Sequence, residues 1–514
     1  MELIHPIAYF LLFLATLTWL LATTLSSSST SKKTPPNTNA PKSYHMIGYI
    51  FAFAANKHRR IQWISDILLS SPSSPTFTLR RLFGSHQVFT ADPAVVQHIL
   101  KSNFQNYPKG PTLRRALGDF LGDGIFNSDG NHWKFQRQLS SHEFSTKSLR
   151  NFIETVVDKE LSNRLIPILS QLSLASSSPC DLEDILQRFA FDNICKIAFG
   201  YDPQYLLPSL PTTTFSMAFD DATRISSQRI YSAVPLIWKI KKILNIGSEK
   251  RLRIAVSEVR GVAQKIIEEK KRELQETKAL QSVDLLSRFL VTGQNDDSFI
   301  RDIVISFILA GRDSTSIVLT WFFWLLANHP HVENEVVEEV NQKNHANASS
   351  VYDELKDMVY THAALCETMR LYPPVAVDMK EAVNDDVLPD GTFVKKGTHV
   401  SYHIFAMGRS ERIWGTDWAE FRPERWLRRD GEGKWAFVGV DPYNYPVFQA
   451  GPRVCLGKEM AFLQMKRVVA GILREFRVVP AMAKGVVPEY TAHLTSLMKG
   501  GFPVRIKRRS QLHM

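Results

Sequence analysis

The stretch Phe448-Gln449-Ala450-Gly451-Pro452-Arg453-Val454-Cys455-Leu456-Gly457 places one cysteine in a glycine-flanked loop, directly before a segment with helical periodicity. A helix amino terminus offers unpaired N–H groups and positive potential, which predicts a lowered pKa and a stabilised thiolate for Cys455. Gly451 and Gly457 let the backbone approach a flat ring system closely, and Arg453 can pair with a carboxylate. The alternative is a buried structural cysteine, the commoner role of an isolated one.

The full pattern F-x-x-G-x-R-x-C-x-G fixes five residue types at set offsets and is far more restrictive than a lone cysteine. It resembles the haem-binding loop of the cytochromes P450. The resemblance implies that Cys455 is the axial ligand of the haem iron and that Phe448, Gly451 and Arg453 contact the cofactor, with Arg453 on a propionate. The implied cofactor is haem b, iron protoporphyrin IX.

Two further segments follow the order typical of that family. Glu367-Thr368-Met369-Arg370 resembles the E-x-x-R motif, whose members lie three apart on one helix face and can form a buried ion pair. Phe421-Arg422-Pro423-Glu424-Arg425-Trp426 resembles the meander motif, in which Arg425 would complete a three-charge cluster. The resemblance implies that Glu367, Arg370 and Arg425 hold the haem loop in place and take no part in catalysis.

Other cations resemble ligands of the haem propionates. Trp133 and Arg137, one helical turn apart, resemble the W-x-x-x-R pair that reaches one propionate. Lys380, ten residues after Arg370, occupies the place where many relatives carry another propionate-binding cation. A solvated surface position for Lys380 is the alternative, because lysines are seldom buried.

The segment Ala310-Gly311-Arg312-Asp313-Ser314-Thr315 lies in a long apolar helical stretch and resembles the oxygen-activating motif A-G-x-D-T-T. We expect Gly311 to weaken the helix ladder and leave room for dioxygen, and Asp313, Ser314 and Thr315 to relay protons. Relatives usually have threonine where this chain has Ser314. Serine supplies the same hydroxyl without the methyl group that restricts its rotamer, so looser coupling of oxygen to product is expected. An ordinary helix with a polar kink is the alternative.

The amino terminus reads as a membrane anchor. Residues 3–25 are almost wholly apolar, which is long enough to cross a bilayer as a helix, and Lys32 with Lys33 follow on the expected cytosolic side. A cleaved secretory signal is the alternative, although Glu2 precedes the stretch. We therefore expect an anchor at 1–25, a Ser/Thr/Pro linker at 26–43 and a cytosolic catalytic domain at 44–514, on a single-pass protein of the endoplasmic reticulum membrane.

Composition narrows the class of protein. The chain has 514 residues, 44% of them hydrophobic and 22% charged, so it can bury a large core. Its formal net charge of +11 is spread along the chain without a basic block, which excludes a nucleic-acid arm and leaves a lipid surface or an acidic protein partner. Four cysteines, widely spaced and without a C-x-x-C pair, favour neither a disulfide scaffold nor a zinc site.

Helical periodicity dominates the body, around residues 149–169, 181–199, 250–276, 298–328 and 456–476. Short β-branched segments at 76–90 and 387–400 predict small sheets. Pro330 and Pro373 should end the helices that precede them. The expected class is mainly α with small β-sheets, and the resemblance implies the cytochrome P450 fold: an α-rich haem domain, a smaller β-rich region and one transmembrane helix.

The chain contains no dinucleotide-binding or flavin-binding fingerprint, so electrons must come from a separate protein. The resemblance implies a membrane-bound NADPH-cytochrome P450 reductase, with O2 and NADPH-derived electrons as co-substrates. Two rival functions remain. A haem-thiolate isomerase or dehydratase needs neither oxygen nor reductase, but such enzymes usually lack the acid and hydroxyls of residues 313–315. A non-catalytic haem sensor or membrane scaffold would not need them either.

At the subfamily level the chain resembles plant fatty-acid ω-hydroxylases, in residues 199–203, 245–252, 307–326, 371–375, 385–391 and 445–472. This implies hydroxylation of the terminal carbon of a fatty acid. The same branch contains enzymes that act on jasmonoyl-amino acids and on steroid side chains, which remain alternatives.

The substrate pocket is expected to include two pairs of residues. Phe307 and Ala310 lie a helical turn apart, and Ala376 with Val377 follow the Pro-Pro break, where relatives contact substrate. Plain core packing is the alternative for each of them. A cation near the entrance is expected to bind the carboxylate, and the sequence leaves four candidates, which are Arg59, Arg60, Arg80 and Arg81.

Overall fold

The computed structural model describes residues 48–71, 74–81, 86–174, 178–211, 213–277, 284–292, 296–345, 350–431, 433–483 and 485–509. The predicted anchor at 1–25 and linker at 26–43 lie outside the described residues and stay predictions. Within the described residues, one helix is long and apolar enough to cross a membrane, Asp297–Asn328, and 83% of its most apolar window is buried inside the protein. It is therefore a core helix.

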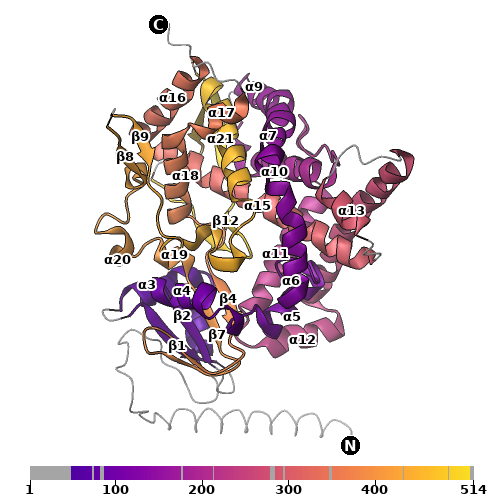
Figure 1. Ribbon diagram of the computed structural model, residues 1–514, viewed down its shortest axis with the longest axis vertical. Helices are drawn as coiled ribbons and strands as arrows, with labels where there is room; N and C mark the ends of the chain where they lie inside the picture. The colour runs from indigo at the N-terminus through magenta and orange to yellow at the C-terminus, as the bar shows by residue number, and fades with distance from the viewer. Residues whose placement is uncertain are drawn as a thin grey trace, which may run out of the picture.

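Helices make up most of the described chain, as the periodicity predicted (Figure 1). In the first half they are α2 Ile50–Ala55, α3 Arg60–Leu69, α4 Pro93–Gln97, α5 Gly110–Leu121, α6 Gly130–Ser141, α7 Thr146–Phe152, α8 Asp158–Glu160, α9 Ile166–Leu174, α10 Leu182–Phe199, α11 Thr214–Ile230 and α12 Pro235–Leu244. In the second half they are α13 Gly247–Thr277, α14 Leu285–Val291, α15 Asp297–Asn328, α16 Pro330–His345, α17 Val351–Lys356, α18 Val359–Leu371, α19 Ile404–Met407, α20 Glu411–Trp414 and α21 Lys458–Glu475.

The strands form small sheets, also as predicted. A four-stranded sheet has the order β1-β2-β7-β4, from Thr76–Arg80, His86–Thr90, His399–Tyr402 and Asp378–Glu381, with β2 and β7 parallel. It lies beside α3 and α4 at one end of the molecule (Figure 1). The other strands are β10 Phe476–Pro480, β13 Pro503–Arg508 and β3 Cys180–Asp181 in a three-stranded sheet, and the pairs β11 Tyr490–Ala492 with β12 Ser496–Met498, β5 Asp386–Val387 with β6 Phe393–Val394, and β8 Leu427–Arg429 with β9 Trp435–Phe437.

Helix α15 runs through the middle of the helical part. Its side chains are apolar on nearly every face, so burial on all sides is the stable arrangement. The carboxylate of Asp296 caps its amino terminus by accepting a hydrogen bond from the backbone N–H of Ser298 at 2.9 Å, and Pro330 starts the next helix. Helix α18 ends at Leu371, before Pro373. Both proline predictions are confirmed.

The segment 149–169 differs from the single helix that we expected. It consists of α7, α8 and α9 joined by wide π turns at Ile153–Val157 and Leu161–Leu165. The buried residues Ile153, Val157, Leu161 and Leu165 recur every four residues, a longer spacing than the 3.6 of an α-helix. Widening the helix keeps these four side chains on the core face.

Three hydrophobic clusters make up the core. The first joins the carboxyl-terminal half of α15 to α18 and α21, and the second joins its amino-terminal half to α11, α13 and α14. The third lies between the four-stranded sheet and the helices α3 and α4. The cavity described below takes wall residues from all three clusters.

A buried carboxyl near the start of α10 makes stability depend on pH. Burial, with the nearby carboxylates, raises the pKa of Glu183 from 4.5 to about 8. The folded chain therefore keeps a proton that the unfolded chain loses, and stability falls as pH rises from about 4.5 to about 8, by up to about 1.4 kcal/mol per unit. We expect Glu183→Gln to flatten this dependence, measured as the urea midpoint of unfolding between pH 5 and pH 8. The exposed substitution Glu268→Gln should leave the wild-type slope, and an unchanged slope in Glu183→Gln would contradict the assignment.

Candidate active site

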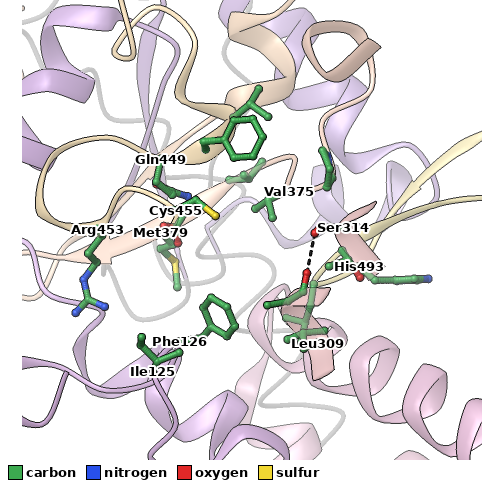
Figure 2. A pocket seen from close by; sticks show the side chains of 18 of the residues that line it. Ile125, Phe126, Leu309, Ser314, Val375, Met379, Gln449, Arg453, Cys455 and His493 are labelled. Atoms are coloured by element: carbon green, nitrogen blue, oxygen red, sulfur yellow. Dashed lines mark hydrogen bonds between the residues drawn. The ribbon is translucent and has the colours of Figure 1, made fainter. Parts of the chain in front are cut away.

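A largely apolar cavity of about 430 Å³ lies between α15 and the loop that carries Cys455. Figure 2 shows Cys455 on one side and Ser314 of α15 on another, with Phe126 and Ile125 beneath the space between them. Leu309 and Val375 complete this region. The same cavity extends to α3 and to the end of β1, so that it connects segments far apart in the sequence.

The Cys455 loop has a backbone that depends on close contacts. It contains two short 3-10 turns, Pro446–Phe448 and Gly451–Arg453, and the N–H of Cys455 donates to the carbonyl of Phe448 at 2.8 Å. Gly451 has a φ of +63°, and a Cβ there would lie 2.1 Å from the carbonyl oxygen of Leu100. This position therefore requires glycine for both conformation and space. The loop presents the Cys455 sulfur to the cavity (Figure 2).

The electrostatics of Cys455 differ from the sequence prediction. Burial raises the pKa of the thiol, and the backbone N–H of Gly457, Arg137 and Lys458 only partly counter that effect. The predicted net lowering by the start of α21 is therefore wrong for the protein alone, because desolvation of the thiolate outweighs the helix terminus. A metal ion at the sulfur would supply the missing positive charge, since a coordinating thiol is deprotonated outright.

The predicted propionate-binding residues Arg453, Trp133 and Arg137 meet on one wall. Arg453 donates to a carboxylate oxygen of Asp129 at 2.7 Å and to the carbonyl of Ser128 at 3.0 Å, and its guanidinium carbon lies 4.4 Å from the centre of the Trp133 ring. Its Nε is buried and has no hydrogen-bond partner among the described residues. The guanidinium carbon of Arg137 lies 5.9 Å from the same ring.

Lys380 is not a surface residue. It is 1% exposed, and its Nζ lies 2.8 Å from a carboxylate oxygen of Asp378. Lys109 pairs with the same carboxylate at 2.9 Å, and Lys109 lies on the cavity wall whereas Lys380 does not. Burial lowers the pKa of Lys380 to about 7. Asp378 opposes this shift, but it also pairs with Lys109, and the charges of Lys109 and Arg453 lower the pKa further. The sequence predicted Lys380 as the lysine near the cofactor, but the lysine on the cavity wall is Lys109, which the sequence reasoning missed.

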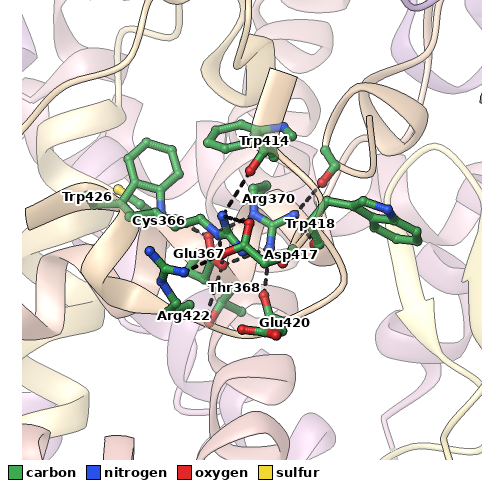
Figure 3. A network of polar contacts seen from close by, with 12 residues as sticks. Cys366, Glu367, Thr368, Arg370, Trp414, Asp417, Trp418, Glu420, Arg422 and Trp426 are labelled. Carbon is green, nitrogen blue, oxygen red and sulfur yellow. Dashed lines mark hydrogen bonds and ion pairs between the residues drawn. The ribbon is translucent and has the colours of Figure 1, made fainter. Parts of the chain in front are cut away.

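The predicted three-charge cluster has a fourth member, Asp417 (Figure 3). Glu367 and Arg370 are fully buried and form a bidentate pair at 2.7 and 2.8 Å. The Nε of Arg425 donates to Glu367 at 3.1 Å, and its Nη1 donates to Asp417 at 2.8 Å. A fifth member, Arg422, also pairs with Asp417, so three cations meet two carboxylates and the cluster keeps an excess of positive charge.

The residues of the oxygen-activating motif face different ways. Ser314 and Thr315 lie on the cavity wall, and the Ser314 hydroxyl donates to the carbonyl of Ala310 at 2.7 Å, which leaves its lone pairs free to accept (Figure 2). Asp313 is not on that wall. Its oxygens accept from Arg312 at 2.8 Å and from the hydroxyl of Thr495 at 2.9 Å. Direct contact between Asp313 and the cavity, as the relay prediction requires, is therefore absent, although Thr495 is itself a wall residue.

Gly311 also differs from its predicted role. A Cβ at this position would lie 2.5 to 2.8 Å from three side-chain carbons of Ile194 on α10. The glycine therefore lets α10 and α15 pack closely, rather than only opening space on the cavity side. Ile194 and Gly311 both line the cavity, so a larger residue here would disturb packing and pocket together.

The predicted pocket residues are on the cavity wall with one exception. Phe307, Ala310 and Val377 line it, but Ala376 is buried in the core, and its carbonyl accepts from the N–H of Phe405. Val375, rather than Ala376, accompanies Val377 on the wall. The prediction fails for Ala376 because this residue packs into the core and binds the backbone of Phe405.

Two of the four candidate carboxylate-binding arginines lie on the cavity wall and two do not. Arg60 and Arg81 line the cavity. Arg59 is exposed and pairs with Asp66 at 2.6 Å, and Arg80 is not a wall residue.

Other wall residues escaped the sequence reasoning because they come from loops without a motif. Ile125 and Phe126 follow α5, and His493, Leu494 and Thr495 lie in the hairpin between β11 and β12.

Comparison with known proteins gives the same family. The family model "Cytochrome P450" matches residues 41–504 of the chain. The chain belongs to the cytochrome P450 family. It is 64% identical to Cytochrome P450 94A2 of Vicia sativa over 98% of each chain. It is also 61% identical to Cytochrome P450 94A1 of Vicia sativa over 91% of this chain and 90% of the relative, and 46% identical to Cytochrome P450 94B1 of Arabidopsis thaliana over 94% of each.

Cytochromes P450 carry a haem whose iron is bound by a cysteine thiolate, and the residues of this P450 fit such a group. The sulfur of Cys455 faces a cavity lined on one side by Arg137, Arg453 and Lys109. The buried Nε of Arg453 has no hydrogen-bond partner among the described residues. Lys109 and Lys380 share one carboxylate, so one positive charge of the pair is not neutralised. Two propionates would supply the missing negative charge, so Arg453, Arg137 and Lys109 would hold them and Cys455 would bind the iron.

We expect Cys455→Ala to abolish the red-shifted absorption band that carbon monoxide gives with the reduced protein, because the band requires thiolate ligation of the haem iron. Cys366→Ala is the matched control, since Cys366 is a second free thiol that is buried and does not line the cavity. The measurement is the reduced carbon-monoxide difference spectrum of each purified variant. A red-shifted band in Cys455→Ala would rule out this ligand.

Proposed function

We propose that this cytochrome P450 monooxygenase hydroxylates the terminal carbon of a fatty acid, using O2 and electrons from NADPH, with haem b as cofactor. The observation that carries the proposal is the cavity itself: it is largely apolar, it has Cys455 and Ser314 on its walls, and it has Arg60 and Arg81 on its wall where it reaches α3 and the end of β1. A fatty acid has the matching pattern, an apolar chain with one anionic end.

The bound thiolate-ligated haem supplies the oxidant that converts a C–H bond and O2 to an alcohol and water, consuming two electrons and two protons. The side chains of this protein contribute position and protons. The Ser314 hydroxyl is held by Ala310 with its lone pairs toward the cavity, so it can accept and pass on a hydrogen bond there. Thr315 lies beside it, and Thr495 connects the cavity wall to the buried carboxylate of Asp313.

Selectivity for the terminal carbon must come from shape, because a methyl C–H bond is stronger than those of the neighbouring methylenes. Phe126, Phe307 and Leu309 surround the region near Cys455 with rigid or branched side chains, and Val375 and Val377 face it from the segment after Pro374. In this proposal these bulky groups select a substrate that enters with its terminal carbon first.

The two alternatives of the same branch differ in how well they match the arginines. A jasmonoyl-amino acid also carries a carboxylate, whereas a steroid side chain offers no partner for the arginines. An isomerase or dehydratase would have no use for the hydroxyls of Ser314 and Thr315 on the wall.

We further propose that the protein is anchored in the endoplasmic reticulum membrane by residues 1–25, with the catalytic domain at 44–514 in the cytosol. Its electron donor there would be a membrane-bound NADPH-cytochrome P450 reductase. The apolar amino terminus and the net charge of +11, suited to an acidic partner near a lipid surface, support this arrangement.

The test is product identification. We expect the haem-loaded protein, incubated with reductase, NADPH and a panel of fatty acids, to form terminal hydroxy acids that mass spectrometry locates by carbon position. Jasmonoyl-amino acids and sterols belong in the same panel. If only jasmonoyl-amino acids or only sterols gave a product, that class would replace fatty acids as the proposed substrate. If no compound in the panel gave an NADPH-dependent product, the monooxygenase proposal would be wrong.

The coupling of oxygen to product should depend on position 314. Ser314→Thr is expected to preserve hydroxylation and reduce the peroxide released per NADPH consumed, because the added methyl group restricts the hydroxyl to fewer rotamers. Ser314→Ala should raise that ratio, since it removes the hydroxyl from the wall. The measurement is peroxide and NADPH in the same reaction. More peroxide from Ser314→Thr than from wild type would contradict the role of this side chain.

A further inference from the structure

Arg60 is an unusual cation for an apolar wall. It is the first residue of α3 and lines the same cavity as Cys455. Its guanidinium carbon lies 4.0 Å from the ring centre of Phe53 and 5.2 Å from that of Tyr231. Both rings are cavity residues as well, so the cation lies between two aromatic groups at the end of the cavity formed by α2 and α3.

The hydrogen-bonding capacity of Arg60 is not used up within the protein. Its Nε is buried without a hydrogen-bond partner, and no carboxylate among the described residues forms an ion pair with it. The neighbouring Arg59 contrasts with it, because Arg59 is exposed and has Asp66 at 2.6 Å. A buried donor without a partner costs free energy, so its retention at a cavity wall points to a ligand that satisfies it.

Arg81 brings a second positive charge to the same region. It lines the cavity, and its Nη1 lies 2.7 Å from Nδ1 of His399, which fixes its direction. Burial raises the pKa of the Tyr49 hydroxyl while Arg81 and Arg60 both oppose that rise, so the two guanidinium groups lie close enough to act on one phenol. The wall also includes the carboxylate of Asp378, but that group already pairs with Lys109 and Lys380, so the region around the two arginines keeps a net positive charge.

We propose that Arg60, assisted by Arg81, binds the carboxylate of the substrate. The inference rests on the proposed function and deepens it, by naming the residue that recognises the anionic end. A guanidinium offers parallel N–H donors to a carboxylate, and burial between Phe53 and Tyr231 strengthens the attraction by excluding water. The carboxylate would occupy the end formed by α3 and β1, and the apolar chain would run toward Cys455.

This anchor also orients the substrate. A chain held by its carboxylate at α3 presents its opposite end, the terminal carbon, to the region between Cys455 and Ser314. Neutral molecules such as sterols would gain nothing from Arg60 and would leave it desolvated. The protein should therefore prefer anionic substrates to neutral ones of similar shape.

The test measures binding to the full-length, haem-loaded protein by the change in haem absorption on titration with dodecanoic acid, hexadecanoic acid and their methyl esters. We expect Arg60→Gln to raise the Kd of the acids about 10- to 100-fold and to leave the Kd of the esters unchanged, because only the acids make a charge-assisted hydrogen bond. Arg60→Lys should restore part of the affinity for the acids, and Arg81→Gln should weaken it less than Arg60→Gln.

Arg59→Gln is the matched control, since it removes an exposed arginine one residue away, and it should leave all four Kd values as in wild type. Equal weakening of acid and ester by Arg60→Gln, or no weakening of either, would overturn the anchor while leaving fatty-acid hydroxylation intact. Failure of wild type to bind both the acids and the esters would instead remove the proposed function.

Discussion

The position of the Cys455 loop depends on one buried carboxylate. Glu367 is fully enclosed and accepts hydrogen bonds from the side chains of Arg370 and Arg425, from the indole of Trp426 and from the backbone of Arg422. Loss of both arginines would leave its charge unpaired in the core, and loss of Trp426 would remove one hydrogen bond from it. The Trp426 ring packs at 4.8 Å against Tyr445, whose hydroxyl donates to the carbonyl of Cys366, and residue 445 leads directly into the loop. The carboxylate thus fixes the meander and, through it, the sulfur.

Helix α15 divides its polar residues between two sides. Ser314 and Thr315 lie on the cavity wall, whereas Arg312 and Asp313 point away from it, where Arg312 reaches Asp220 of α11 at 2.8 Å. Burial raises the pKa of Asp313, against the opposing effects of Arg312 and Thr495. Arg312 and Asp313 therefore connect this apolar helix to α11 and to the hairpin between β11 and β12. The hydroxyls of Ser314 and Thr315 remain on the cavity wall.

Motifs with fixed spacing were predictable from the sequence, and contacts between distant loops were not. The cysteine loop, the Glu367–Arg370 pair and the helix ends at Pro330 and Pro373 follow from local chemistry. The sequence did not predict Asp417 as a member of the charge cluster, because an aspartate in a loop belongs to no periodic pattern. Lys109 and Lys380 share the carboxylate of Asp378 although they lie far apart in the sequence, and sequence spacing does not show which of them reaches the cavity. Likewise, the backbone direction after Pro374, rather than composition, selects Val375 over Ala376.

The cavity takes one wall from each of three separate hydrophobic clusters: Val318 and Met369 from the first, Phe307 and Leu309 from the second, Phe53 and Phe89 from the third. A change of side-chain volume on one wall is absorbed mainly by the cluster behind it, because residues of different clusters share few neighbours. During evolution the residues of one wall can therefore change and alter selectivity while the other two walls keep their packing.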